Sequence, residues 1–311
     1  MTLIPWRSEF LAGADNLPEP CTRRWHFVHG NGFCARTLTP VATELQALLA
    51  GAVGGAVGVD AGSDHADGFL FTDLPGHGDA PPAPEQTQRR MPDWIAMADH
   101  LADSVAGRGR APLIGVGHSM GGVVTLLAAA RHPGLFERIV LLDPVLFSSE
   151  VLLFQRMMRL TGWWTKTGLV KSVSARRARW PDRATAREEL SRKSLYRQWR
   201  TDALDAFVQH GLKPVLDDDS QPTEEVMLSC DPEWEAAIFG SYPKGLWQAV
   251  QEVSCRVDIM VASSSYPFIK RSTAKAARMN SLIKVHPIDG SHCFPMEAPE
   301  TAARWIRDLC Q

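Results

Sequence analysis

Residues 113–122 place a serine where it could act as a nucleophile. An apolar run predicts a strand, Gly-x-Ser-x-Gly follows around Ser119, and an Ala- and Leu-rich stretch at 123–130 predicts a helix. Such a turn holds the hydroxyl out at the end of the strand, with a helix N-terminus beneath it to favour developing negative charge. Gly117 and Gly121 lack the Cβ atoms that would clash where strand and helix nearly touch. The pattern predicts a nucleophile elbow at Ser119.

A serine hydroxyl is a weak nucleophile unless a base takes its proton and a third group orients that base. His292 lies in Gly-Ser-His after the last predicted strand, and we expect it to be the base. Asp143 ends the apolar strand predicted at 138–142 and is the candidate orienting carboxylate. The alternative for Asp143 is a structural turn before Pro144, a normal use of Asp.

Two further loops stand upstream: His-Gly-Asn-Gly at 29–32 and Asp-Leu-Pro-Gly-His-Gly at 73–78. These loops, the elbow and the Gly-Ser-His, in this order, resemble the α/β-hydrolase family. The resemblance implies an oxyanion hole made of two backbone N–H groups, one from Met120 and one from the 29–32 loop. The family pattern favours Asn31 for the second donor, and Gly32 is the alternative.

One part of the chain departs from the common family pattern. The usual acid follows the strand that corresponds to residues 256–262, but here that turn reads Ala-Ser-Ser-Ser-Tyr-Pro and contains no carboxylate. Asp143 resembles instead the acid of a branch, including many haloalkane dehalogenases, that places it after an earlier strand. Because a serine triad otherwise lacks its orienting carboxylate, we favour Asp143 over a structural role.

Strands that alternate with helices predict an α/β fold: a mostly parallel α/β-hydrolase sheet covered by helices on both faces. Helices are expected at 37–49 and 91–106, with a surface loop at 51–68. The alternation stops between 143 and 257. We therefore expect a core domain of residues 1–147 and 251–311, and a helical cap of residues 148–250 inserted in the middle of the chain.

Within the predicted cap, residues 151–160, 187–199 and 202–210 look helical. Six tryptophans lie there, most of them expected in the cap core and one or two at the pocket. Charge is polarised: residues 150–200 are rich in Lys and Arg, and residues 201–235 in Asp and Glu. The first half could take an anionic substrate or dock on an anionic surface. We favour the alternative that the two halves neutralise each other.

Composition narrows the function further. A net charge of -2 gives no reason to expect nucleic acid, and the six cysteines show no metal-ligand spacing, so neither a metal nor a cofactor is expected. Residues 1–16 carry Arg7, Glu9 and Asp15 and have no apolar run of signal-peptide length. The longest uncharged stretch, 111–130, is interrupted by glycines, His118 and Ser119, so no membrane span is expected. We predict a cytoplasmic protein with a small-molecule acyl substrate, and leave a homo-oligomer open.

The nucleophile sets the expected reaction class. Dehalogenases and epoxide hydrolases of this fold attack with Asp at the elbow, and Ser119 argues against both. Serine, histidine and an oxyanion hole suit a hydrolase that cleaves a small carboxylic ester, thioester or lactone through an acyl-enzyme. Two alternatives remain: a carbon–carbon bond hydrolase on the same triad, and a hydrolase-fold binding protein whose triad is vestigial.

Overall fold

The structure, a computed structural model, describes residues 8–10, 21–53, 66–82, 91–106 and 112–311. Most of the loop predicted at 51–68 lies outside the described residues, and its ends belong to a helix and a strand. Within the described ranges, every helix is too short or too polar to span a lipid bilayer.

Seven strands form the central sheet, in the order β1-β3-β2-β4-β5-β9-β10. Their bounds are β1 (Ser8–Phe10), β2 (Cys21–Val28), β3 (Ala66–Thr72), β4 (Leu113–His118), β5 (Arg138–Leu142), β9 (Arg256–Ser264) and β10 (Ile283–Ser291). Neighbouring strands run parallel, except that β1 pairs antiparallel with β3 at one edge. Parallel strands bring their carboxyl ends to one edge of a sheet, and that edge is where the chain leaves β4, β5 and β10.

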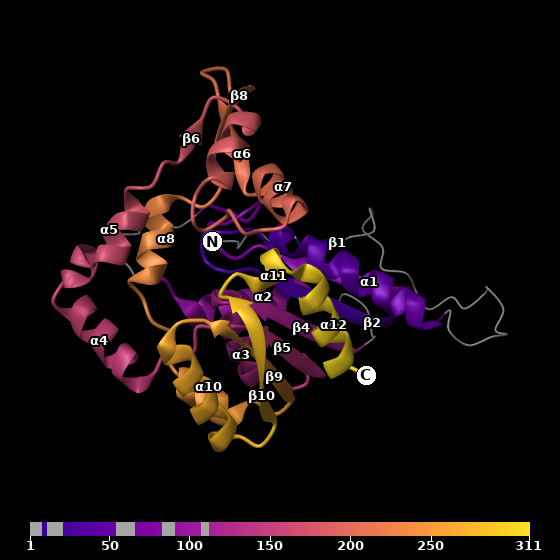
Figure 1. Ribbon diagram of the computed structural model, residues 1–311. Coiled ribbons are helices and arrows are strands. Elements are labelled where there is room, and N and C mark those ends of the chain that lie inside the picture. The colour runs from indigo at the N-terminus through magenta and orange to yellow at the C-terminus, as the bar shows by residue number, and fades with distance from the viewer. Residues whose placement is uncertain (1–7, 11–20, 54–65, 83–90, 107–111) are drawn as a thin grey trace.

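Helices cover both faces of this sheet, as Figure 1 shows. One face packs on α1 (Thr39–Val53) and α12 (Pro299–Leu309). The other face packs on α2 (Trp94–Val105), α3 (Met120–Arg131), α9 (Leu246–Glu252) and α10 (Pro267–Met279). Side chains alternate between the two cores, since Val140 and Leu142 join the first while Ile139 and Leu141 join the second. The mostly parallel sheet with helices on both faces is the predicted fold class.

Local signals located two of these helices well. The helix expected at 37–49 is α1, preceded by the short 3-10 helix η1 (Ala35–Leu38). The helix expected at 91–106 is α2, and the Asp93 carboxylate caps it by accepting hydrogen bonds from the N–H groups of Ile95 and Ala96. Both predictions are confirmed.

Between β5 and α9 the chain leaves the sheet and forms what we call the insert, residues 148–240. Its elements are α4 (Ser149–Leu160), η2 (Trp163–Lys166), α5 (Gly168–Ser174), β6 (Arg179–Trp180), α6 (Arg183–Ser191), α7 (Thr201–His210), β7 (Leu212–Leu216), β8 (Pro222–Leu228) and α8 (Pro232–Phe239). The predicted helices at 151–160 and 202–210 correspond to α4 and α7. In Figure 1 the insert stands above and to the left of the sheet.

The insert departs from the expectation of helices alone in two ways. A small antiparallel sheet, β6-β8-β7, lies within it. Strand β6 has two residues, and few residues of β7 and β8 are buried, so these strands lack the apolar runs that marked the strands of the main sheet. The helix expected at 187–199 ends at Ser191, and 3-10-like turns follow because Tyr196 and Trp199 are buried in an aromatic cluster with Phe33 and Phe207. Tertiary packing overrides helical propensity there.

Helix α9 crosses the end of the range expected for the cap, 148–250. It packs against α3 and α10, with the helices that cover the sheet. The last element wholly outside the sheet and its covering helices is therefore α8.

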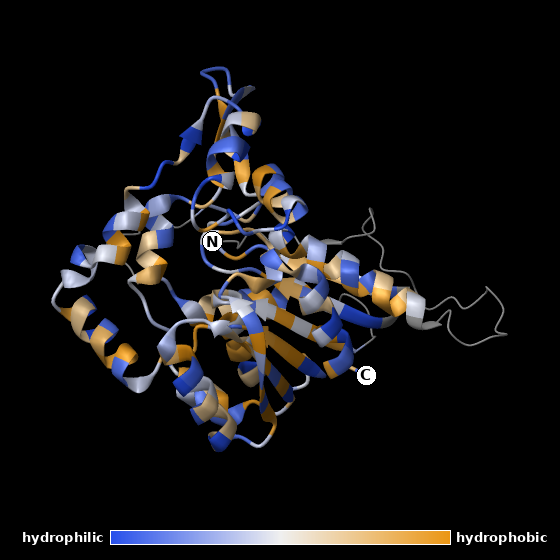
Figure 2. Cartoon of the chain, in the orientation of Figure 1, coloured by the Kyte–Doolittle hydropathy of each residue, from blue (hydrophilic) through white to orange (hydrophobic). Residues whose placement is uncertain are grey.

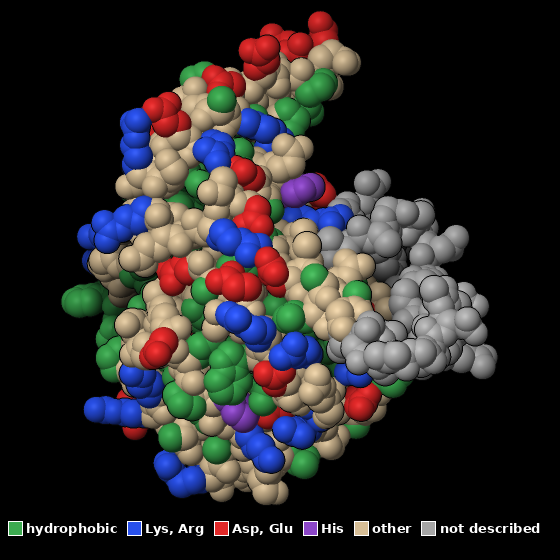
Figure 3. Space-filling model, turned by 45° about the vertical axis from the view of Figure 1, so that its right-hand side comes forward, with side chains coloured by type: hydrophobic (Ala, Val, Ile, Leu, Met, Phe, Trp, Pro, Cys, Tyr) green, Lys and Arg blue, Asp and Glu red, His purple; other side chains and the backbone are tan. Residues whose placement is uncertain are grey.

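The two halves of the insert are linked by ion pairs, including Arg176–Glu235 at 2.7 Å, Arg187–Asp205 at 2.5 Å and Arg179–Glu225 at 4.0 Å. These pairs support partial neutralisation between the basic and acidic halves. Figure 3 shows acidic side chains still gathered at the top of the molecule, over the β7–β8 hairpin.

Candidate active site

Ser119 stands at the turn between β4 and α3 with a backbone that few residues adopt. Its φ is 54° and its ψ is -115°, a conformation that is strained for a residue with a Cβ. A Cβ at Gly117 would lie 2.6 Å from the Gly121 carbonyl oxygen, and one at Gly121 would lie 2.4 Å from the carbonyl oxygens of Val28 and His29. Both glycines are required by these close approaches, as the predicted elbow needs.

Three of the predicted residues meet at this edge of the sheet. The Ser119 Oγ lies 2.9 Å from His292 Nε2, and His292 Nδ1 lies 2.6 Å from Asp143 Oδ2. Asp143 immediately follows β5 and His292 immediately follows β10, so the topology of the sheet brings them beside β4. Because a carboxylate accepts at Nδ1, the imidazole presents its Nε2 lone pair to the serine hydroxyl. This arrangement can accept a proton from Ser119.

Hydrogen bonds fix both the backbone and the carboxylate of Asp143. Its backbone φ is 46°, and its N–H donates to the Met260 carbonyl at 2.8 Å. Its side chain is fully buried, with Oδ1 accepting from the Ala262 N–H at 3.0 Å and Oδ2 accepting from the Ser265 hydroxyl. The Ser-rich turn that lacks a carboxylate therefore contributes a donor to Asp143. Sequence reasoning missed this role of Ser265.

Two carboxylates of the neighbouring strands β9 and β10, Asp258 and Asp289, lie elsewhere. Asp258 is buried and pairs with Arg256 at 3.0 Å and His286 at 2.9 Å. Asp289 is exposed to solvent. Among these candidates, only Asp143 reaches the His292 ring.

The 29–32 loop lies against the elbow, where a Cβ at Gly30 would be 3.2 Å from the Ser119 Cβ. The Gly32 N–H donates to His77 Nε2 at 3.1 Å, so this group is already committed. The Asn31 side chain donates from Nδ2 to the Glu235 carbonyl at 3.0 Å, and Asn31 lines the cavity at Ser119. Met120 is the first residue of α3, and the first N–H groups of a helix lack an intrahelical acceptor. Of the two donors considered in this loop, the Gly32 N–H therefore already has an acceptor.

Buried neutral histidines frame this site. His118 donates from Nε2 to the His292 carbonyl at 2.9 Å and so anchors the loop that carries His292. Burial lowers the pKa of His118 to about 3, with His292 opposing its charge as well. Burial also lowers the pKa of His77 to about 4. His29 donates from Nδ1 to the Gly30 carbonyl and accepts from the Leu74 N–H, which ties the two upstream loops together.

A cavity of about 270 Å³ opens in front of Ser119 and His292. Its core side is lined by aromatic and aliphatic residues, among them Phe33, Trp94 and Phe268. Residues of the insert line the other side: Val151, Gln155, Leu169, Leu195, Ile238 and Phe239. Trp94 of α2 lines this cavity, whereas the six tryptophans of the predicted cap are not among its lining residues.

One charged side chain beside this cavity was not anticipated. Glu235 lines the cavity and is nearly buried, and its Oε2 lies 2.7 Å from Arg176 Nη1. Burial raises the pKa of the Glu235 carboxyl, and Arg176 opposes that shift. A Cβ at Gly32, whose φ is +78°, would lie 2.4 Å from Glu235 Oε1. The run Trp-Glu-Ala-Ala-Ile, a charge inside an apolar stretch, was the available sequence signal.

Among the described residues, no group of three His, Cys, Asp or Glu side chains is placed to hold a metal ion. Five cysteines are free thiols: Cys34, Cys230, Cys255, Cys293 and Cys310.

The sequence of this chain is similar to those of known proteins. Residues 27–305 match the sequence profile of the Alpha/beta hydrolase family. A segment of 74 residues is 35% identical to the sn-1-specific diacylglycerol lipase ABHD11 of Mus musculus, covering 24% of this chain and 22% of that protein. A segment of 103 residues is 30% identical to the abhydrolase domain-containing protein AFT2-1 of Alternaria alternata, covering 32% of this chain and 34% of that protein.

Solved structures extend the likeness over most of the chain. The peroxisomal alpha-beta-hydrolase Lpx1 of Saccharomyces cerevisiae superposes with a TM-score of 0.69 at 17% identity, covering 93% of this chain and 76% of that one. An esterase of Mycobacterium tuberculosis gives a TM-score of 0.65 at 21% identity, covering 93% of this chain and 85% of that one. The thioesterase domain from the curacin biosynthetic pathway gives 0.66 at 18% identity, covering 97% and 99%. At these identities the likeness shows the fold, and the family profile spans most of the chain. The chain belongs to the alpha/beta hydrolase family.

Proposed function

We propose that this protein hydrolyses a small carboxylic ester, thioester or lactone through an acyl-enzyme on Ser119. The observation that carries the proposal is the continuous chain of contacts Ser119 Oγ–His292 Nε2–Asp143 Oδ2, at 2.9 and 2.6 Å. The similar proteins support it, because they include an esterase, a thioesterase domain and a lipase.

Acylation follows from these contacts. The Ser119 Oγ attacks the acyl carbonyl carbon while its proton passes to His292 Nε2, and Asp143 stabilises the imidazolium that forms. The N–H groups of Met120 and Asn31 donate to the carbonyl oxygen as it becomes an oxyanion. The tetrahedral intermediate collapses with cleavage of the bond to the alcohol or thiol, which takes the proton from His292.

Deacylation repeats the sequence with water. His292 takes a proton from a water molecule, whose oxygen attacks the ester carbon of the acyl-enzyme. The second intermediate releases the carboxylic acid and returns the proton to the Ser119 Oγ. No cofactor is required for either half of the reaction.

In this proposal the insert acts as a cap that limits substrate size. Its apolar side chains, with Leu169 and Leu195 among them, close one side of the 270 Å³ cavity. A cavity of this volume suits a small or medium acyl group rather than a polymer. The cytoplasmic location and a homo-oligomeric state stay predictions, to be checked by cell fractionation and analytical ultracentrifugation.

A fluorophosphonate probe and a panel of p-nitrophenyl esters, aryl esters, thioesters and lactones test the proposal. We expect covalent labelling of Ser119 in the wild type, no labelling of Ser119→Ala, and turnover of at least one class. Labelling with no ester, thioester or lactone turnover would favour the carbon–carbon bond hydrolase. A Ser119 that neither labels nor turns over any substrate would favour the binding protein.

A further inference from the structure

Exposed large hydrophobic side chains are concentrated in one small part of the described chain. Ten such side chains are strongly exposed in the described chain, and six of them lie between residues 153 and 169: Leu153, Phe154, Met157, Leu160, Trp163 and Leu169. Single exposed apolar residues are normal on protein surfaces, but a contiguous group marks an interaction site.

Helix α4 carries four of them as a stripe. Leu153, Met157 and Leu160 recur at helical spacing with Phe154 beside them, and none of the α4 residues is buried. Figure 2 shows hydrophobic residues along α4 at the outer edge of the molecule. We call Leu153, Phe154, Met157 and Leu160 the α4 stripe.

Hydrogen bonds from the other side of the helix fix the direction of this stripe. Gln155 Nε2 donates to the Phe239 carbonyl at 3.2 Å, and Arg159 donates to the carbonyls of Gly240 and Ala237 at 2.7 and 2.8 Å. These bonds hold one face of α4 against the end of α8. The stripe cannot turn inward without breaking them, so its exposure is a built feature.

Positive charge surrounds the stripe. From Ser149 to Ser174 the chain carries Arg156, Arg159, Lys166 and Lys171, against Glu150 as the acidic residue. The Lys166 ammonium lies 5.2 Å from the centre of the exposed Trp163 ring. An apolar helix face flanked by Lys and Arg, with an aromatic side chain nearby, is the pattern of a helix that lies in a membrane interface.

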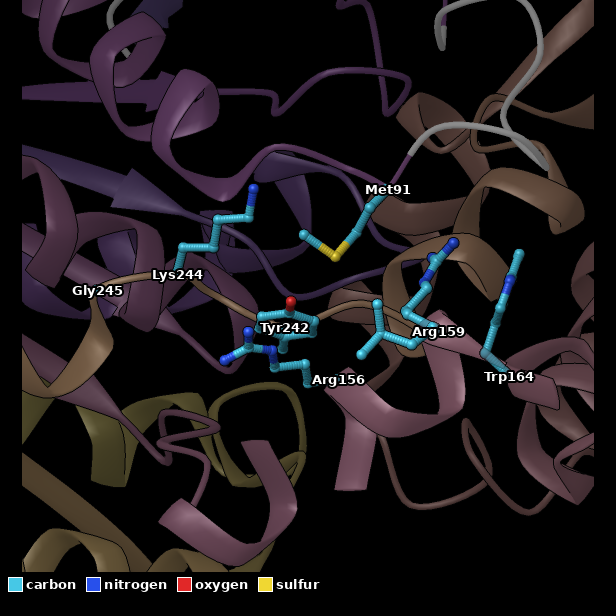
Figure 4. A pocket seen from close by; sticks show the side chains of 8 residues that line it. Met91, Arg156, Arg159, Trp164, Tyr242, Lys244 and Gly245 are labelled. Carbon is cyan, nitrogen blue, oxygen red and sulfur yellow. The ribbon is translucent and has the colours of Figure 1, made fainter. Parts of the chain in front are cut away.

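A cationic cavity of about 850 Å³ adjoins the stripe. Arg156 and Lys244 lie to one side of Tyr242 and Arg159 to the other, as Figure 4 shows. The described residues that line it include these three cations and no carboxylate. Neither Arg156 nor Lys244 forms an ion pair with a described residue. Arg159 already donates to the carbonyls of Gly240 and Ala237, and burial lowers its pKa to about 10. An anion beside it would favour the charged guanidinium.

We propose that the α4 stripe docks on the surface of an anionic phospholipid membrane, with a lipid phosphate in the Arg156–Arg159–Lys244 cavity. The two features fit one partner, because a phospholipid carries a phosphate directly above its acyl chains. A membrane-bound state would also place the catalytic cavity near the lipid, since Leu169 is both exposed and part of that cavity's lining. The docking does not depend on hydrolysis by Ser119.

Vesicle co-sedimentation of the full chain tests this, with phosphatidylcholine vesicles compared with vesicles of phosphatidylcholine and phosphatidylglycerol. We expect binding to the anionic vesicles, weakening as salt is added. Phe154→Ser with Leu160→Ser should lower the partition coefficient by roughly tenfold or more, because two large apolar side chains no longer leave water. Arg156→Gln and Lys244→Gln should each lower it by roughly fivefold.

Matched controls come from the far end of the insert. Leu216 is 56% exposed, as Phe154 is at 55%, and Lys213 is an exposed cation on the same strand β7. Leu216→Ser and Lys213→Gln should bind like the wild type. Ser119→Ala should also bind like the wild type, which separates a failure of docking from a failure of the proposed hydrolysis.

Three results would overturn the docking proposal. One is equal, negligible sedimentation with both kinds of vesicle. Another is an equal loss for the β7 controls and the α4 variants. The third is a wild type that self-associates in analytical ultracentrifugation, with Phe154→Ser and Leu160→Ser converting it to a monomer. That result would make the stripe an interface between two copies of this chain.

Discussion

The edge of the sheet at Ser119 and the insert above it differ in how firmly their residues are fixed. Asp143 is buried and makes four polar contacts, through its N–H and both carboxylate oxygens. Helix α4 has no buried residue and is held through Gln155 and Arg159. Chemistry needs atoms held within fractions of an ångström, whereas a surface that admits substrates can vary. We expect substitutions at this edge of the sheet to lower the reaction rate. Substitutions in the insert should instead change which substrates are accepted.

The largest effect is expected at the nucleophile. Ser119→Ala removes the attacking atom, so ester turnover should fall by several orders of magnitude, on the order of 10⁴ or more. Steady-state kinetics on the best p-nitrophenyl ester measure this, and mass spectrometry of the wild type should show an acyl adduct on Ser119. Full esterase activity in the variant would end the proposal.

The next effect tests the orienting carboxylate. Asp143→Asn keeps the shape, removes the charge and can hold the wrong His292 tautomer, so kcat should fall by roughly 10³ to 10⁴. Ser265→Ala removes one donor to Asp143 and should cost far less. Circular dichroism should show both variants folded. An Asp143→Asn enzyme near wild-type rate, with a large loss at Asp258 or Asp289 instead, would contradict the assignment.

A third prediction concerns stability against pH. Since the pKa of His118 is lowered to about 3 and that of His77 to about 4, the folded protein binds fewer protons than the unfolded chain between pH 4 and 6.5. Stability is therefore greatest above about pH 6.5 and falls as the pH is lowered, by roughly 1.4 kcal/mol per pH unit for each histidine. Urea unfolding at several pH values measures this. His118→Gln should show a shallower dependence, and equal slopes would refute the role of His118.

The smallest effect is expected in the insert. Leu195→Ala enlarges the catalytic cavity and should shift preference toward longer acyl chains by roughly tenfold or less, with little loss on the shortest ester. Leu216→Ala, outside the cavity, should leave the ranking unchanged. If Leu195→Ala slowed all esters equally, the insert would support stability and not selection.

Ser119, Asp143 and His292 could be predicted from the sequence because each follows a strand with a strong local signal. Buried strands end immediately before Ser119 and Asp143, and parallel topology brings their ends together with His292. Sequence reasoning missed Ser265 and Glu235, whose positions depend on side-chain contacts between distant segments. It also missed the β6-β8-β7 sheet and the turns at 192–200, where short strands and aromatic packing leave no periodic pattern.

His292 lies far from Ser119 and Asp143 in the sequence, so a ribosome makes it later. His292 meets Ser119 across 173 residues of chain and meets Asp143 across 149. A growing chain thus completes the elbow, β5 and the whole insert before its base exists. Closing so long a loop is slow compared with forming local structure. The nascent chain therefore carries the proposed nucleophile without its proposed base until β10 is made and joins the sheet.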